Sequence, residues 1–589
     1  AYAERGSERA RATYAIDLAA AAGGCLVAPR LIGPLSPIEI IIVLGLVSCV
    51  LVRRWLIVLA LIALLIASRY LPDGPLAVLL ASGPQSDKAI VEAGTSRRDV
   101  VDSRWSPLGR LDVHRVPGDR DRYGVFTDGM SPTYMIRAGS TGFETTWGML
   151  MALPYRALHP ARVLVLGAGA GASVRLAKKY GAAVVDAVEV NPAIPDLLAR
   201  WKPFTGDPYH EPGVHLVTAD ARRFLADTDE HYDLIELALA LTGNAHAQPA
   251  GLEAHLYTVE AVKLYLRHLS PNGVLVLIHS DPGNAYRQLL TVIAALGDHA
   301  LDGIVVLRDP RPGTAYRYMI VVQATAMPLD VADRLDAEPA ELLWGPGDSL
   351  ERRRQLLDPA QLGATGRDDL SPVHDDRPYF FQNTKGLVAT ALAEPARLWV
   401  LIAALVLALV ASAGQGRAAA TATGLGAGYL CVELALIQRF TLAAGGTLYA
   451  VSFVLFCLLG WSAVGAVLPR SRGVTRACLL AAAAVAVTAI LVRDVSWLDA
   501  IASDPGRLAT IALLLAPVGL AIGRPFPTLL ARPDIRIASL WAVNGAASVA
   551  GGIVAVLALR VGGSTDALIL ASVLYLTAAV VAPRSTLAA

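Results

Sequence analysis

The clearest chemical pattern in the chain is a set of residues that each follow a short apolar run: Gly167, Gly169, Gly171, Glu189, Asp220 and Ala221. Glycines let a backbone approach a ligand where a side chain would clash. Glu189, about 20 residues beyond the glycines, is placed to accept hydrogen bonds from both hydroxyls of a ribose. Asp220 can accept one from the exocyclic amine of adenine. Together these residues predict a nucleotide site.

Such residues meet only if parallel strands bring them to one edge of a sheet. The middle of the chain alternates strand and helix patterns, which favours a parallel sheet. The expected strands are residues 163–166, 184–189, 214–217, 232–237, 274–278, 304–307 and 316–323. The last two predict an antiparallel hairpin that closes the sheet. We therefore predict an α/β Rossmann-like, methyltransferase-type domain with a seven-stranded sheet.

Both ends of the chain have the composition of a membrane protein. Hydrophobic residues make up 54% and charged residues 17%, and the mean hydropathy is +0.49. The N-terminal apolar runs are 14–33, 37–52 and 55–70, and the C-terminal ones are 398–413, 421–440, 446–468, 477–493, 507–522, 537–559 and 565–582. Runs of this kind predict helices that span a lipid bilayer. The Rossmann-like domain is thus expected between two all-α transmembrane bundles.

The predicted organisation has six parts: N-terminal transmembrane helices at 1–72, a linker at 73–104, a β lid at 105–145, the nucleotide-binding domain at 146–326, an extension at 327–396 and a C-terminal bundle of about seven helices at 397–585. The motif from Tyr14 to Gly24 parallels that from Trp541 to Gly551, so residues 1–72 are interpreted as an incomplete repeat unit. Small residues at 545–552 allow close helix packing, within the bundle or between copies in a homo-oligomer.

Charge and metal-ligand patterns exclude other classes. A net charge of +1 provides no field for nucleic acid. The histidines His246, His255, His268 and His279 fit no compact ligand set, so no metal is expected. All five cysteines lie in apolar segments and are interpreted as packing residues.

The distribution of arginines predicts an orientation in the cell (inner or plasma) membrane. In the C-terminal bundle one side receives Arg417, Arg470, Arg472, Arg476, Arg524, Arg532, Arg536 and Arg584. By the positive-inside rule that side is cytoplasmic. The count places the central domain on the extracytoplasmic side, in conflict with the cytosolic origin expected of its nucleotide ligand.

Several motifs resemble the spermidine synthase family, and more closely its membrane-fused members: Ser106–Gly109, Thr127–Gly129, Val163–Gly171, Ala219–Ala221, Tyr232–Ile235, Leu252–Glu253, Tyr257–Glu260, His374–Phe381 and the helix Gly428–Arg439. The resemblance covers roughly residues 106–381 and extends into the flanking helices. It implies S-adenosylmethionine or its decarboxylated form as co-substrate. The Asp375-Asp376-Arg377 motif, ahead of Pro378 and an aromatic cluster, is expected to dock the domain on the membrane.

The chain departs from the family where the second substrate would bind. Family members carry an aspartate in the glycine loop, where this chain has Ala170. The family's catalytic aspartate corresponds to Ala238, a second acidic position to Leu241, and a glutamine to Pro132. Aminopropyl transfer needs carboxylates and a base to hold and deprotonate an amine. The usual synthesis of spermidine is therefore not expected.

Other residues could take over these roles. Glu236 lies two residues before Ala238, so in a strand it points to the same side. Glu236 and Glu253 are the candidate catalytic residues. Asp128, Glu144, His255 and Tyr257 are the acceptor-side candidates. For each, a purely structural role is the alternative.

Two functions follow from these patterns. The first is a membrane-embedded transferase that moves a methyl or aminopropyl-type group to an amine or lipid-like acceptor. The second is a non-catalytic nucleotide sensor on a transporter-like or scaffold membrane module. The polar residues Asp17, Glu433 and Asn544, which are costly in lipid, motivate the second.

Overall fold

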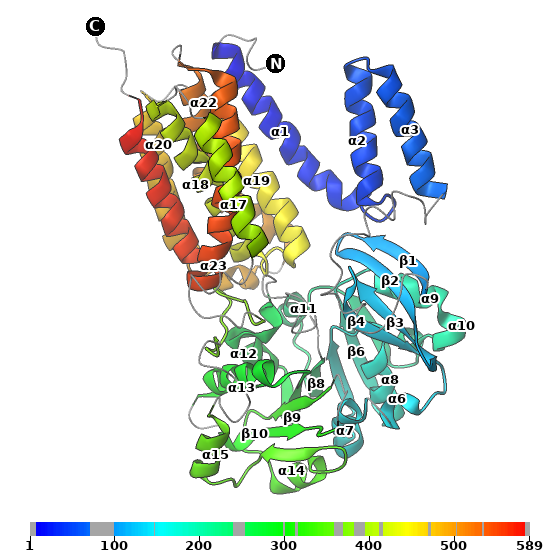
Figure 1. The fold of residues 1–589 in the computed structure, drawn as a ribbon. Coiled ribbons are helices and arrows are strands. Elements are labelled where there is room, and N and C mark those ends of the chain that lie inside the picture. Colours follow the sequence, from blue (N-terminus) through cyan, green and yellow to red (C-terminus); the bar gives the residue numbers. More distant parts are fainter. Residues whose placement is uncertain are drawn as a thin grey trace.

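The computed structural model places an α/β domain at one end of a bundle of long helices (Figure 1). It describes residues 7–70, 99–145, 148–238, 254–297, 301–311, 316–358, 369–381, 395–411, 416–468, 473–501, 503–532 and 535–583. The start of helix α1 (Ser7–Leu31) and the end of helix α23 (Ile537–Val581) lie at the end of the bundle away from the α/β domain.

The main sheet has eight strands in the order β12-β10-β11-β9-β8-β5-β6-β7. Their bounds are β5 Arg162–Leu166, β6 Val184–Glu189, β7 Val214–Thr218, β8 Tyr232–Ala238, β9 Leu269–His279, β10 Ile304–Arg308, β11 Tyr318–Val322 and β12 Glu341–Trp344. The strands from β7 to β9 pair in parallel, whereas β11, β10 and β12 pair antiparallel. The expected closing hairpin is β10–β11.

The prediction of seven strands is wrong, because β12 adds an eighth strand beside β10. Glu341–Trp344 spans only four residues, too short for a periodic pattern to stand out in the sequence. Its stability comes from tertiary contacts. Trp344 is buried in the core, and its indole nitrogen donates to the carbonyl of Leu301 at 3.3 Å.

Helices cover both faces of this sheet. They are α6 Gly142–Thr145, α7 Met149–Leu158, α8 Ala172–Lys179, α9 Ala193–Arg200, α10 Lys202–Thr205, α11 Ala221–Asp227, α12 Val259–Arg267, α13 Pro282–Leu296, α14 Leu329–Leu335 and α15 Leu350–Leu356. Helices α7, α8, α9 and α14 share one core with Leu234 of β8. Helices α11, α12 and α13 share the other with Ile235. Because side chains alternate along a strand, Glu236 belongs to the face of Leu234.

A separate four-stranded antiparallel sheet forms the lid. Its strands are β1 Val100–Ser106, β2 Gly109–Val116, β3 Asp119–Thr127 and β4 Met130–Ile136, paired in sequence order. Strand β1 starts before residue 105, where we expected the lid to begin. In Figure 1 the lid lies next to helices α2 (Pro37–Leu51) and α3 (Trp55–Tyr70).

In the described part of the chain, six helices are long and apolar enough to cross a membrane, which is consistent with a multi-pass membrane protein. They are α1, α18 (Gly416–Phe440), α19 (Thr447–Val467), α20 (Val474–Leu491), α21 (Asp504–Ile522), which continues into the short α22 (Pro525–Leu530), and α23. Helices α2, α3 and α17 (Pro395–Ala411) are apolar but shorter.

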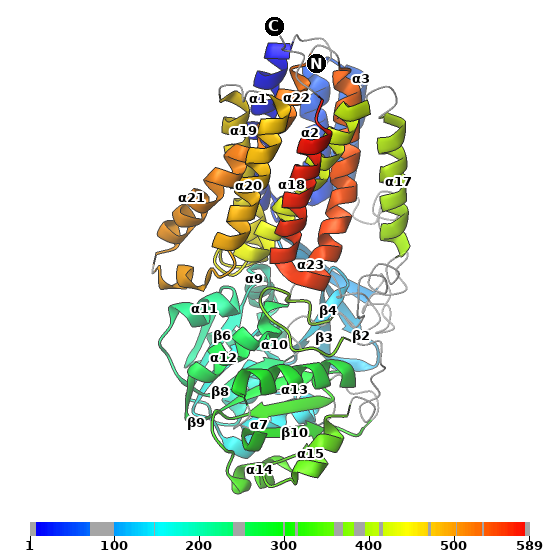
Figure 2. The same ribbon diagram turned by 90° about the vertical axis from the view of Figure 1, so that its left-hand side faces the viewer.

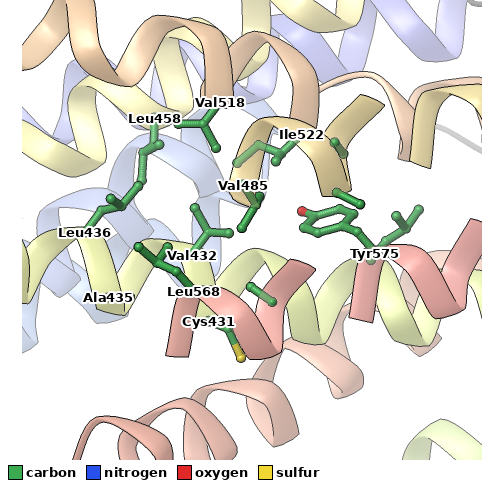
Figure 3. Packing of buried hydrophobic residues seen from close by; sticks show 14 of the residues in the cluster. Cys431, Val432, Ala435, Leu436, Leu458, Val485, Val518, Ile522, Leu568 and Tyr575 are labelled. Atoms are coloured by element: carbon green, nitrogen blue, oxygen red, sulfur yellow. The ribbon is translucent and has the colours of Figure 1, made fainter. Parts of the chain in front are cut away.

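The last two predicted helices are the two limbs of α23, which meet at Gly563, where the backbone is not helical (φ 86°, ψ −175°). Its two limbs flank α18. A Cβ on Gly426 would lie 2.4 Å from the carbonyl oxygen of Asn544 in the first limb, and one on Gly424 would lie 3.0 Å from that of Leu574 in the second. Small residues therefore let both limbs approach α18 closely. Figure 3 shows the apolar packing around Cys431 and Tyr575.

Candidate functional site

The glycine loop between β5 and α8 adopts a backbone that requires glycine. Gly167, Gly169 and Gly171 have φ angles of 72°, 53° and 85°. A Cβ on Gly169 would lie 2.5 Å from the hydroxyl oxygen of Thr133 in the lid. That hydroxyl instead accepts a hydrogen bond from the Ala170 amide at 2.9 Å. The lid and the loop thus pack directly, and the backbone is preorganised for a ligand.

Glu189 ends β6 and organises this loop. Its Oε2 accepts from the Gly169 amide at 2.9 Å, and its Oε1 accepts from the Asn191 amide at 2.8 Å. Burial raises the pKa of the Glu189 carboxyl, while these backbone hydrogen bonds oppose the shift. Each carboxylate oxygen retains acceptor capacity for a ribose hydroxyl. Tyr209 closes the arrangement by donating from its hydroxyl to the Gly169 carbonyl at 2.5 Å.

Asp220 caps helix α11, one strand further along the sheet. Its Oδ1 accepts from the amides of Arg222 at 2.9 Å and Arg223 at 3.1 Å. Among the described residues no hydrogen bond reaches Oδ2, so this oxygen can accept from a base amine. Ala221 is buried in the core below and serves as a packing residue.

Val190, which follows Glu189, is a candidate that sequence reasoning missed. It is 46% exposed although it directly follows a buried strand. An apolar side chain exposed between Glu189 and the Asp220 edge can pack against the face of a purine. Because Val190 directly follows Glu189 in the sequence, this position could have been identified as a candidate contact of the base.

Glu236 lies near the end of β8, fully buried between helices α7 and α8. Its Oε2 accepts from the Tyr155 hydroxyl at 2.5 Å, and its Oε1 has no hydrogen-bond partner among the described residues. Burial raises the pKa of Glu236 to about 7, although Tyr155 and Ser173 act to lower it. Ser173 is in the first turn after the glycine loop, so this carboxyl lies close to the loop.

Tyr316 lies near this carboxyl, and Tyr134 lies near Tyr316. Burial raises the pKa of Tyr316, and Tyr134 and Glu236 raise it further through their charge. Tyr134 belongs to the lid and Tyr155 to α7. A buried carboxylate with tyrosine side chains nearby suits a cationic or amine ligand. These three tyrosines come from distant segments, and no sequence pattern links them to Glu236.

The structure places His255 and Tyr257 elsewhere. Both are buried in a short 3-10 helix, and Tyr257 belongs to the core on the opposite face of the sheet from Glu236. The ring of Tyr257 stacks on Phe380 with centroids 4.6 Å apart. Nδ1 of His255 lies 3.8 Å from Oδ1 of Asp375. The structure does not bring these two acceptor-side candidates together with Glu236.

The structure describes only some of the remaining candidates. Asp128 is exposed in the β3–β4 turn, with a φ of 52°, and accepts from the Arg110 amide at 2.8 Å, so it joins two turns of the lid. Glu144 lies in α6. Glu253 and Leu241 fall outside the described residues. Ala238 ends β8, and Ala170 is buried in the loop.

No cluster of three or more histidine, cysteine, aspartate or glutamate side chains suitable for a metal occurs in the described part of the chain. The described residues of the site offer carboxylates, tyrosine hydroxyls and backbone amides. Such groups bind by hydrogen bonding and charge, and they can exchange a proton with a substrate.

Sequence comparison finds similarity to polyamine aminopropyltransferases. The enzyme of Korarchaeum cryptofilum is 27% identical over 124 residues, which are 21% of this chain and 36% of that protein. The enzyme of Alkaliphilus oremlandii is 30% identical over 121 residues, or 20% and 40%. The chain thus shows weak homology to these transferases and spans less than half the length of either. No family model matches the chain.

Solved structures of spermidine synthases also match part of the chain. That of Thermotoga maritima has a TM-score of 0.30 at 18% identity and covers 40% of this chain and 75% of the other. A spermidine synthase in complex with the transition-state analogue AdoDATO has a TM-score of 0.33 at 17% identity and covers 45% and 89%. TM-scores this low carry no argument about function.

Proposed function

We propose that this chain is a membrane-embedded transferase that binds S-adenosylmethionine or decarboxylated S-adenosylmethionine. The donor's ribose is assigned to Glu189, its base to Val190 and Asp220, and its chain to the glycine loop. Three successive strand ends that meet at one edge of the sheet support this assignment. The weak homology to polyamine aminopropyltransferases supports a transferase in the same broad sense.

The proposed role of the acceptor site depends on the buried carboxyl of Glu236. A buried carboxyl with a pKa of about 7 can take a proton from an amine near neutral pH. In the proposed step the acceptor nitrogen attacks the carbon beside the sulfonium and the carbon–sulfur bond breaks. The sulfur leaves as a neutral thioether, and the amine proton passes to Glu236.

The group transferred is proposed as methyl or of the aminopropyl type. The absence of an acid at Ala170 and Ala238 favours methyl transfer, which needs mainly in-line positioning of the acceptor. The proposed acceptor is an amine or a lipid-like molecule, since the carboxyl edge of the sheet faces the helical bundle.

A test begins with mass spectrometry of any nucleotide that copurifies with the full-length protein. The carboxylate of S-adenosylmethionine distinguishes it from the decarboxylated donor. Binding of both compounds is then measured to the wild type and to Glu189→Ala. We expect the variant to lose at least about 100-fold in affinity, since the loop loses its organising acceptor as well as a ligand contact. Unchanged affinity would refute the donor assignment.

A second candidate function is a non-catalytic sensor on a transporter-like or scaffold bundle. Two hydrogen bonds of Asp376 favour this function. The backbone carbonyl of Asp376 accepts from the side-chain amide of Gln438 at 2.8 Å, and its carboxylate accepts from the hydroxyl of Ser564 at 2.5 Å. These residues lie on α18 and at the turn of α23, so the domain and bundle are joined at that turn. Donor binding without any product from polyamines, lipids or cell extract would favour this function.

A further inference from the structure

The adenine-side carboxylate of the proposed donor site lies against a loop of the helical bundle. The loop 441–446 joins α18 to α19, and a Cβ on Gly446 would lie 3.5 Å from Cβ and 3.6 Å from Oδ2 of Asp220. Gly446 has a φ of 112°, which other residues rarely adopt. Oδ2 is also the oxygen that the helix cap leaves available.

Arg507 holds this loop, and a neighbouring ion pair joins α11 to the bundle. Buried Arg507 of α21 donates to the Ala443 carbonyl at 2.9 Å and to the Ile501 carbonyl at 3.1 Å. Next to it, Arg223 of α11 pairs with Asp499 of the 3-10 helix Ser496–Ala500 at 3.1 Å. Figure 2 shows this end of the bundle above α11. The contact at Gly446 is thus part of a supported interface.

We propose that the loop 441–446 forms the outer wall of the donor's base subsite, and that the absence of a side chain at Gly446 leaves room there for the base. This inference rests on the proposed function. A base amine that donates to Oδ2 would lie about 2.9 Å from it, in the space next to Gly446. The ligand expected there is a purine whose exocyclic amine meets Asp220. The base subsite would then be completed by the membrane bundle.

Two neighbouring glycines provide a matched test. Gly445 has a φ of 89° and open space around its Cβ position, so a side chain there meets similar backbone strain without approaching Asp220. Affinity for S-adenosylmethionine, its decarboxylated form and adenosine is measured on the full chain in detergent by calorimetry. We expect Gly446→Leu to weaken binding at least about tenfold, and Gly445→Leu to change it less than about twofold. Equal effects of both, or none from Gly446→Leu, would overturn the inference.

A second pair of variants covers the case in which the leucine variants fail to fold. Asp499→Arg places like charges beside Arg223 and should loosen the contact of α11 with the 3-10 helix next to the loop. Arg223→Asp with Asp499→Arg restores an opposite pair there, and Asp227→Asn is added so that the new carboxylate at position 223 has no like charge beside it. We expect donor affinity to fall about tenfold and then return in the combined variant. If Asp499→Arg alone binds the donor with the affinity of the wild type, the proposed wall is contradicted.

The two proposals fail differently. If Glu189→Ala binds the donor as tightly as the wild type, the proposed function is wrong and the wall with it. If Glu189→Ala loses the donor but Gly446→Leu and Asp499→Arg do not, the donor site stands without a wall from the bundle.

Discussion

Asp375 and Asp376 are adjacent in the chain, yet their carboxylates bind two different parts of the protein. Asp375 accepts from both terminal nitrogens of Arg222 in α11, at 3.0 and 2.9 Å. Asp376 pairs with Arg439 of α18 and accepts from Ser564 of α23. One dipeptide therefore joins the start of the helix that Asp220 caps to the turn of the bundle.

Removing the first of these contacts should destabilise the protein. Burial acts to raise the pKa of Asp375, but the opposing effect of Arg222 and His255 is larger. The net shift of the pKa is therefore downward, and the carboxylate is charged. Asp375→Ala would leave the largely buried Arg222 without its anion, at a cost of about 3 kcal/mol. Asp499→Ala, which removes a half-exposed partner, should cost less than about 1 kcal/mol. Thermal unfolding in detergent and hydrogen exchange of α11 measure both; equal losses would contradict the role of Asp375.

Glu236→Gln should abolish proton acceptance without disturbing the donor site. We expect kcat to fall at least about 100-fold while donor affinity stays unchanged. In the wild type the rate should rise as the pH passes about 7, because Glu236 accepts a proton only when ionised. Tyr155→Phe removes a hydrogen bond that lowers the pKa of Glu236, so this rise should shift to higher pH. A profile that is flat near pH 7 in the wild type would remove Glu236 from the chemistry.

The same carboxyl predicts a pH-dependent stability. The pKa of Glu236 in the folded protein is above its usual value, so the folded state binds the proton more tightly than the unfolded state. The destabilisation therefore develops as pH rises from about 4.5 and is complete above about 7. Glu236→Gln should unfold at a higher temperature than the wild type at pH 8, with little difference at pH 4.5. An equal difference at both pH values would contradict the raised pKa.

Gly169 should tolerate no side chain, in contrast to Gly181, which serves as its control. Both have a positive φ, of 53° and 97°. A Cβ on Gly169 meets the Thr133 hydroxyl at 2.5 Å, whereas one on Gly181 meets open space. Gly181→Ala should therefore cost only backbone strain, about 1 kcal/mol. Gly169→Ala should in addition displace the lid and reduce donor affinity at least about tenfold; calorimetry that finds equal affinities would contradict this.

The sheet was predictable because its signals are local. Each parallel strand is a short apolar run, and Glu189 and the glycines lie at fixed offsets from those runs. Strand β12 was missed because its four residues depend on pairing with β10. The two helices expected at 537–559 and 565–582 are the two limbs of α23, and the non-helical Gly563 turns the chain between them without a polar loop.

The acceptor half was less predictable because its residues meet only through the fold. The alternation of side chains along β8 predicts the face of the sheet on which Glu236 lies. Tyr155, Tyr316 and Tyr134, however, come from α7, the segment before β11 and the lid. Sequence proximity grouped His255 and Tyr257 with the acceptor, whereas the sheet separates them from Glu236. Gly446 and Asp220 lie side by side although they are more than 200 positions apart in the sequence, which no local pattern reveals.

The orientation prediction can be tested by labelling cysteines from outside intact cells. The distribution of arginines predicts that the α/β domain lies outside the cell. Arg53, in the turn between α2 and α3, lies at the opposite end of the bundle and is therefore expected on the cytoplasmic side. Arg120 of the lid and Arg53 are both exposed, so Arg120→Cys and Arg53→Cys form a matched pair in a background without the native cysteines. A membrane-impermeant maleimide should label Arg120→Cys in intact cells, and label Arg53→Cys only after lysis. The reverse pattern would place the domain in the cytosol, where its proposed donor is made, and would show that the distribution of arginines does not set the orientation of this chain.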